Sequence, residues 1–99
     1  MTYDLQGKGE LIESVTSPNG NYLANVYLIN EGGATVAPQI RVAIDSQNGN
    51  NEFNDKTIYW EYRIDNADVM WIDDEHVKIN DKGLNIHTDS YNYKDYINK

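Results

Sequence analysis

Cysteine is absent from this chain of 99 residues, and proline occurs only twice. The lack of cysteine excludes disulfide bonds, thiolate catalysis and cysteine-based zinc sites. No apolar stretch approaches the roughly 20 residues that a membrane-spanning helix needs. No segment has the charged, apolar and small-residue order of a signal peptide. We therefore expect the chain as given to be soluble and monomeric.

Basic side chains are also scarce, because eight Lys and Arg stand against 16 Asp and Glu and give a net charge of −8. A protein that binds a nucleic-acid backbone needs Lys and Arg to displace counterions. The charge therefore argues against a nucleic-acid partner and against adsorption to anionic lipid. A solvated acidic surface accounts for the negative charge. The alternative is an acidic inhibitor that docks on a basic protein through Asp73, Asp74 and Glu75.

Motifs for catalysis and metal binding are missing as well. The Asn- and Asp-rich run from Asp45 to Asp55 fails as an EF-hand loop, because Lys56 occupies the twelfth position, where glutamate is required. There is no Gly-rich phosphate loop, serine nucleophile motif or metalloprotease helix. Glu61 has an aromatic residue on each side, but strand alternation is predicted to point it outward. We predict no cofactor and no enzymatic activity.

What the chain does contain is alternation of apolar and polar residues with period two, clearest between residues 57 and 86. Three further strands are predicted before this stretch, at residues 10–16, 21–30 and 39–45. The pattern predicts an all-β fold: a single small domain of six or seven antiparallel strands in a meander, forming a curved sheet, a sandwich or a partly open barrel. The strand at 21–30 is apolar on both faces and is expected to be central. The predicted core consists of Trp60, Trp71, Tyr22, Val26, Ile40, Val42, Val69, Val77 and Ile79.

Turn residues between these strands predict three registers. A turn at residues 17–20 pairs the strand before it with the strand at 21–30. A three-residue loop at 73–75 and a glycine-bearing turn at 80–83 set the registers of the last two hairpins. The predicted opposite pairs are Val15 with Tyr22, Leu11 with Val26, Trp71 with Val77, Val69 with Ile79, Ile79 with Leu84, Val77 with Ile86 and His76 with His87.

The last of these pairs raises the question of a metal site. Two imidazoles with a carboxylate can hold a metal ion, and four acidic residues lie within three positions of His76 or His87. Both histidines, however, are predicted on the face opposite the core valines, where exposed polar residues are expected. We therefore predict no metal site.

The domain boundaries follow from the same patterns. Residues 1–10 are predicted as a flexible lead-in, residues 11–87 as the all-β domain, and residues 88–99 as a tail. One turn of helix within the tail is marginal alone, so docking through its tyrosines is the alternative to a free tail. The longest polar loop, at residues 46–56, has Phe53 as its only apolar anchor.

Three residues are candidates for ligand binding. Tyr27 and Tyr59 are predicted on the faces opposite the main apolar sets of their strands, and Asn25 shares the face of Tyr27. An exposed row of tyrosine and asparagine side chains suits the binding of a sugar or a peptide. The alternative is a pair of tyrosines that stabilises the sheet across strands.

Two segments, GELIESVTSPNGNYLANVYLINEGGAT at residues 9–35 and KTIYWEYRIDNADVMWIDDEHVKINDKGLNI at residues 56–86, carry a resemblance. They contain an SP-N/D-G-x-Y turn, a glycine pair before Ala-Thr, an IYWxY strand and a W-x-D-x-x-x-V-x-I-N segment. With these features the chain resembles a family of small uncharacterised proteins from Gram-positive, Bacillus-type bacteria. The family has no assigned activity.

The resemblance implies a location as well as a fold. Members of that family typically carry an N-terminal transmembrane helix, with this domain on the extracytoplasmic side of the cell membrane. We therefore expect a non-enzymatic binding or structural module of the cell envelope, whose partner is an unknown protein or a cell-wall component. A hydrolase acting on cell-wall glycan is the alternative from another class, and it requires two carboxylates about 5–10 Å apart in a cleft.

Overall fold

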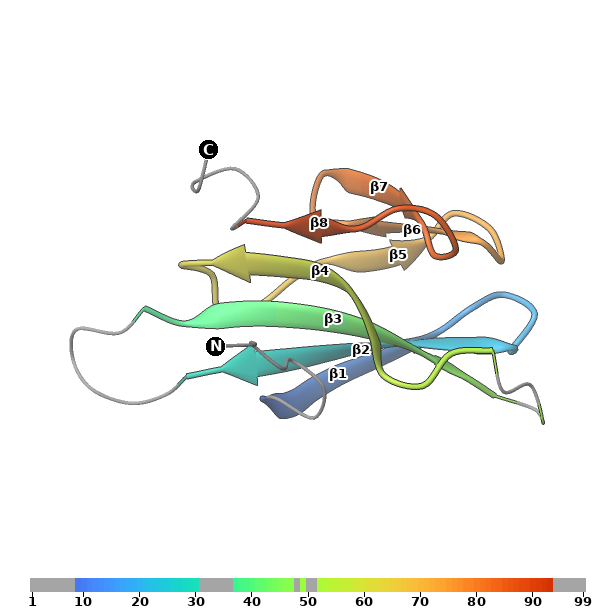
Figure 1. Ribbon diagram of the computed structural model, residues 1–99, viewed down its shortest axis with the longest axis horizontal. Coiled ribbons are helices and arrows are strands. Elements are labelled where there is room, and N and C mark those ends of the chain that lie inside the picture. The colour runs from blue at the N-terminus through green and yellow to red at the C-terminus, as the bar shows by residue number, and fades with distance from the viewer. Residues whose placement is uncertain (1–8, 31–36, 48, 50–51, 94–99) are drawn as a thin grey trace.

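A computed structural model describes residues 9–30, 37–47, 49 and 52–93. These residues form eight strands in a five-stranded and a three-stranded sheet, and no helix (Figure 1). The all-β prediction is confirmed, with one strand more than the larger number predicted. The strands are β1 (Glu10–Thr16), β2 (Tyr22–Ile29), β3 (Gln39–Ser46), β4 (Lys56–Tyr62), β5 (Val69–Trp71), β6 (His76–Ile79), β7 (Lys82–Asn85) and β8 (Tyr91–Asn92).

The larger sheet has the strand order β1-β2-β3-β4-β8, so β2 is flanked on both sides, as predicted. β1 to β4 are antiparallel, and β8 runs parallel to β4. The smaller sheet, β5-β6-β7, is an antiparallel meander. Among the described residues, no helix is long and apolar enough to cross a membrane.

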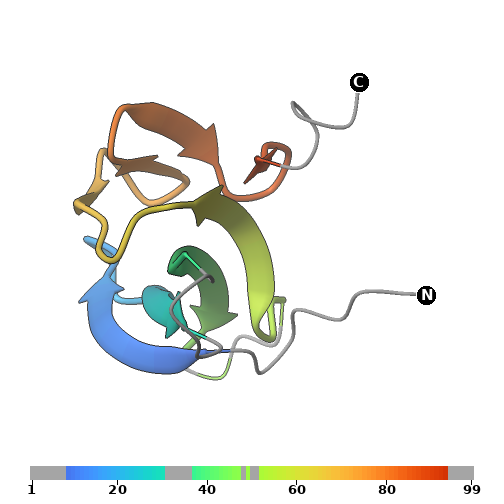
Figure 2. The same ribbon diagram turned by 90° about the vertical axis from the view of Figure 1, so that its left-hand side faces the viewer.

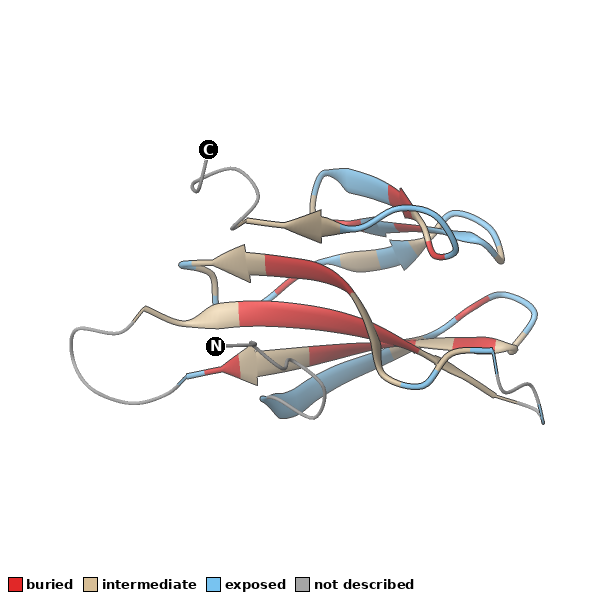
Figure 3. Cartoon of the chain, in the orientation of Figure 1, coloured by how far each residue is buried: buried red, intermediate tan, exposed pale blue. Residues whose placement is uncertain are grey.

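The core lies between the two sheets, which pack without closing into a barrel (Figure 2). Most residues of β2 and β3 are buried, whereas most of β1 is exposed (Figure 3). Val69 and Trp71, predicted as core, are partly buried against it. The buried residues of this cluster are Tyr22, Ala24, Val26, Ile40, Val42, Ile44, Ile58, Tyr59, Ala67, Val77, Ile79, Leu84 and Ile86.

The first hairpin differs from the predicted register. Val15 lies opposite Ala24 rather than Tyr22. The loop is wider than predicted because Ser17 closes it: its N–H donates to the Tyr22 carbonyl at 2.8 Å, and its hydroxyl accepts from the Tyr22 N–H at 3.1 Å. The shift is two residues and therefore leaves the faces unchanged. A bulge at Ile12 then places Leu11 opposite Tyr27 rather than Val26, so the predicted pair was wrong and Leu11 lies on the outer face.

A second bulge reverses the predicted faces of β4. Val42 lies opposite Tyr59 and Ala43 opposite Thr57, so Ile58 has no counterpart on β3. An extra residue in one strand moves every side chain beyond it to the other face. Tyr59 therefore joins the core side, against the prediction, while Trp60 is buried on the opposite face.

In the smaller sheet one predicted register is confirmed and one is wrong. Trp71 lies opposite Val77, and Val69 opposite Ile79, as predicted. Val77 lies opposite Leu84 rather than Ile86, because Asn80 adopts a φ of 55° and allows a tighter two-residue turn. The side chains of β7 keep their predicted faces, since this shift is also two residues.

The predicted tail contributes β8 and is docked by its tyrosines as far as residue 93. The Tyr91 ring lies 5.4 Å from that of Tyr59. The Tyr93 ring packs edge-on to Trp60 at 5.1 Å and stacks on Tyr62 at 5.3 Å. The rest of the tail, the glycine pair at residues 32–33 and most of the predicted lead-in lie outside the described residues.

Candidate functional site

A groove opens between the two sheets where β1 approaches β5. Its volume is about 350 Å³. The two sheets are joined by a hydrogen bond from Trp71 Nε1 to the Val15 carbonyl at 2.9 Å. The lining residues are Glu13 from β1, Ala67, Asp68, Val69 and Met70 at the start of β5, and Lys78 and Asn80 from β6 and the turn after it.

Exposed apolar side chains occur on the two edge strands beside this groove, and one of them, Met70, lines it. Among the described residues, the large hydrophobic side chains that are exposed are Leu11, Ile12, Met70 and Ile72, at 53%, 43%, 65% and 60%. Two of them belong to β1, and the other two lie in β5 or directly after it. β1 and β5 are each an edge strand of their sheet. An edge strand presents unpaired backbone groups to which another extended chain can pair.

The groove carries acidic side chains on both walls. Glu13 projects from β1 on the core side of the larger sheet, since it lies opposite Val26. Asp68 stands on the other wall, and Lys78 is the basic residue among those that line the groove. Two carboxylates against one ammonium leave the groove negative, in line with the charge of the whole chain.

The tyrosine and asparagine row predicted as a binding surface is not assembled. Tyr59 is 2% exposed and accepts a hydrogen bond from Asn80 Nδ2 at 3.0 Å. Burial raises its pKa, and the nearby carboxylates of Glu61 and Asp81 add to the effect, whereas the Asn80 hydrogen bond lowers it. Because the bulge at Ile58 turns Tyr59 inward, its predicted exposure was wrong.

Asn25 and Tyr27 lie on the opposite face of the larger sheet, and Asn25 is only 5% exposed. Its side chain accepts from the Ser14 hydroxyl at 2.6 Å and donates to Asp45 at 2.6 Å. Its hydrogen-bonding groups are therefore engaged within the sheet, and the prediction that it faces solvent was wrong.

Tyr27 covers a buried arginine rather than offering a free ring. The Arg41 guanidinium lies 4.3 Å from the Tyr27 ring centroid. Arg41 is fully buried, and its Nη1 donates to Asp55 and to Thr57, each at 3.0 Å. Partial burial raises the pKa of Tyr27, and the carboxylates of Asp55 and Asp45 add to the effect, whereas Arg41 lowers it. A buried ion pair with a ring packed on the guanidinium accounts for Tyr27 and Arg41 on this face without a ligand.

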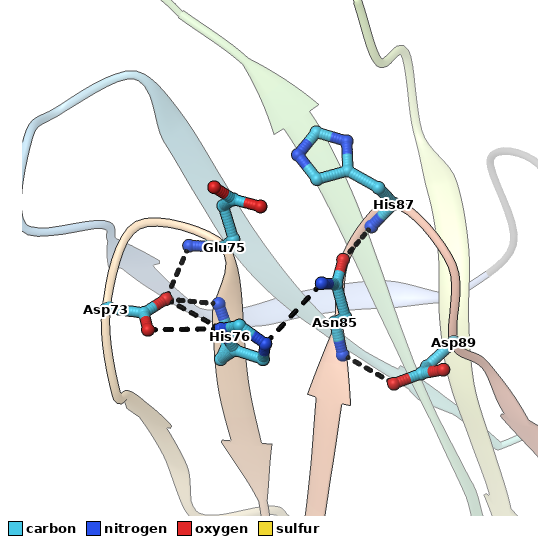
Figure 4. Close-up of polar contacts among 6 residues, drawn as sticks. All are labelled: Asp73, Glu75, His76, Asn85, His87 and Asp89. Atoms are coloured by element: carbon cyan, nitrogen blue, oxygen red, sulfur yellow. Dashed lines mark hydrogen bonds and ion pairs between the residues drawn. The ribbon is translucent and has the colours of Figure 1, made fainter.

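The two histidines are not a cross-strand pair, because Asn85 lies opposite His76. His76 Nδ1 donates to Asp73 Oδ1 at 2.9 Å, and its ring does not point towards His87 (Figure 4). The hydrogen bond to Asp73 raises the pKa of His76. The pKa of Asp73 is lowered, first by the Glu75 backbone N–H and then by His76. No group of metal-ligating side chains occurs among the described residues.

His87 instead closes an aromatic cluster at the far end of the larger sheet. Its Nδ1 lies 2.9 Å from Glu52 Oε2, and the other oxygen of Glu52 accepts from the Tyr22 hydroxyl at 2.7 Å. The Phe53 ring packs against both, 5.7 Å from Tyr22 and 5.3 Å from His87, and the Tyr22 and His87 rings lie 6.1 Å apart. Phe53 therefore anchors the polar loop, as predicted, and Glu52 ties that loop to the segment after β7.

The acidic turn proposed for inhibitor docking is partly engaged within the domain. Asp73 accepts from the backbone N–H groups of Glu75 and His76, each at 2.8 Å. Asp74 accepts from the Asn19 N–H at 2.8 Å, which joins this turn to the first hairpin loop. Two of the three carboxylates therefore stabilise turns.

The sequence patterns predicted none of the groove residues as binding residues. Two signals in the chain mark the edge strands beside the groove. Leu11 and Ile12 are adjacent apolar residues in one strand, and Met70 to Ile72 are three in a row. Since neighbours in a strand point to opposite faces, each run places an apolar side chain outside the core. That Glu13 and Asp68 line one groove depends on how the two sheets pack, which no local pattern records.

The comparisons with known proteins give a family but no function. No curated protein and no solved structure matches the chain. The sequence model of a family of unknown function (DUF5412) matches residues 1–96, which is nearly the whole chain. The chain therefore belongs to this family of unknown function.

Proposed function

We propose that this domain is a non-enzymatic binding module of the cell envelope, and that it holds a partner protein in the groove between β1 and β5. The observation that carries the proposal is the gathering of exposed apolar side chains along the two strands that flank the groove. Singly exposed apolar residues need no explanation, but four on adjoining sheet edges mark an interaction surface.

The predicted sugar-binding face loses its support from the structure. Stacking on a sugar ring needs an accessible aromatic face. Tyr59 is in the core, and Tyr27 has its ring against Arg41. A protein partner at the groove is therefore favoured over a glycan at these tyrosines.

A hydrolase acting on cell-wall glycan is the competing proposal, because Glu13 and Asp68 line one groove. Catalysis by paired carboxylates needs one of them to be held protonated by an apolar setting. Both residues are exposed. This setting favours ion pairing with a partner over proton transfer to a glycosidic oxygen.

Attachment to the membrane on its extracytoplasmic side is the second half of the proposal, and it rests on the family resemblance in residues 9–35 and 56–86. The test is fractionation of cells that carry the native gene, followed by protease treatment of intact cells. We expect the protein in the membrane fraction and open to external protease. Recovery in the cytoplasm would contradict the location.

Binding at the groove is tested with the ¹⁵N-labelled domain. Its NMR spectrum is recorded with detergent-solubilised envelope proteins and, separately, with peptidoglycan fragments. We expect broadening of amides at the groove with the proteins, abolished by Met70→Asp, and no change with the fragments. Shifts at Tyr27 with the fragments would favour a glycan site. Release of cleaved fragments, lost in Glu13→Gln, would favour the hydrolase.

A further inference from the structure

The charge on the groove walls points to the chemistry of the occupant. We propose that the groove receives an extended, basic segment of a partner protein, in which lysine or arginine alternates with apolar residues. This inference rests on the proposed function and names the class of ligand for the same site.

The extended shape follows from the position of β1 in the sheet. β1 pairs with β2 on one side, and no described strand pairs with its other side. The outward backbone groups of a terminal strand are satisfied by a second extended chain lying along it. The bulge at Ile12 interrupts a regular ladder. We therefore expect the contacts to centre on Glu13, where the groove lies.

The apolar half of the pattern matches the outer face of β1. Successive side chains of an extended segment point to opposite faces. In a segment paired with β1, one set of side chains therefore lies on the outer face, where Leu11 is opposite Tyr27 and is 53% exposed. We expect the apolar side chains of the segment on that face.

The basic half of the pattern matches the carboxylates. The other set of side chains points into the groove, which Glu13 and Asp68 both line, so cationic side chains at alternate positions of the segment reach these carboxylates. The net charge of −8 also steers a basic partner towards the domain. A second copy of the chain is disfavoured as the occupant, because pairing of the same edges brings Glu13 of each copy together.

The test is an NMR titration with three blocked hexapeptides, in which valine alternates with lysine, serine or glutamate. We expect the lysine peptide to shift the amides of Glu13, Asp68 and Met70 at low salt and to bind more weakly as salt is raised. The double variant Glu13→Gln, Asp68→Asn is expected to weaken binding about fivefold or more. The control Glu75→Gln, Asp81→Asn carries the same charge change on exposed residues outside the groove and is expected to bind like the parent.

The outcomes separate this inference from the proposed function. If the serine or glutamate peptide bound as tightly as the lysine peptide, the inference that the occupant is basic would be overturned. So would unchanged affinity in the groove variant, or a dimer that grows with domain concentration. If no peptide shifts the groove while envelope proteins still broaden it, the occupant is wrong and the proposed function stands. If neither probe affects the groove, both fail.

Discussion

The two edges of the larger sheet differ in how far they are covered by other parts of the chain. Beyond β4 the chain returns as β8, and the Tyr93 N–H donates to the Trp60 carbonyl at 2.9 Å. Tyr91 and Tyr93 then cover the neighbouring rings of β4. At the other side β1 is exposed over most of its length, and Trp71 of the smaller sheet donates a hydrogen bond to its Val15 carbonyl.

One edge of the larger sheet is covered and stabilises the fold, whereas the other edge is left open to another chain. Aromatic side chains at the β4 side are used to close the edge against water and against other chains. At the β1 side comparable apolar surface remains uncovered. We infer that the first edge serves the fold and the second serves a partner, and the predictions below test that division.

Trp60→Ala is expected to have the largest effect on stability. Trp60 is 2% exposed, contacts Tyr93 and donates to Gln39 at 2.7 Å, so its removal leaves a cavity and an unpaired amide. We expect a loss of about 3–5 kcal/mol in the free energy of unfolding. The matched change at the open edge, Met70→Ala, is expected to cost less than about 0.5 kcal/mol. Urea unfolding of both variants checks this, and similar losses would remove the distinction between the edges.

The chain patterns predicted the strands and the core far better than the faces of β4. Val26, Ile40 and Val42 were placed in the core by alternation, because each lies in a strand without an interruption at that point. The reversal at Tyr59 arises from one unpaired residue, Ile58. A bulge depends on how two strands fit together over their whole length, and the alternating sequence of β4 reads equally well without it.

The registers and the last strand illustrate two further limits. Thr16 is held opposite Leu23 by hydrogen bonds that Ser17 makes across a wider loop, whereas turn composition alone favours the tight turn. β8 has two residues and pairs in parallel with a strand some thirty positions earlier. So short a segment has no periodicity to detect, and its place is determined by the tyrosine contacts. The groove is missed for the same reason, since it exists only between packed sheets.

Trp71→Phe is expected to have an intermediate effect, because it keeps a ring and removes the hydrogen bond to the Val15 carbonyl. We expect a loss of about 0.5–1.5 kcal/mol. Amide exchange is also expected to rise in β1 and β5, which this bond joins, and to stay unchanged in β4. Equal acceleration in all three strands would mean that the bond has no local role in holding the groove together.

The smallest effect is expected from the ion pair of His76 and Asp73 at the exposed turn. The raised pKa of His76 means that its contribution is complete below the ordinary histidine pKa of about 6.5 and is lost as pH rises through the folded-state value. The lowered pKa of Asp73 means that its contribution is complete above the ordinary value of about 3.9 and is lost as pH falls. The pair therefore stabilises most between these limits.

His76→Gln removes this pair and serves as the comparison. Unfolding is measured in urea at pH 5.5 and pH 8 for the parent and the variant. We expect the parent to lose slightly more stability than the variant on going to pH 8. An identical change in both proteins would show that the pair contributes nothing.

The division between a structural edge and a binding edge is tested most directly by site-specific photo-crosslinking in cells that carry the native gene. A photoreactive residue replaces Met70 at the open edge or Asp81 in the turn between β6 and β7, both of which are exposed. The account predicts a discrete adduct from position 70 alone, which mass spectrometry maps to a partner segment rich in lysine or arginine alternating with apolar residues. Adducts of equal yield from both positions, or an adduct from position 70 that maps to an acidic or helical segment, would contradict it.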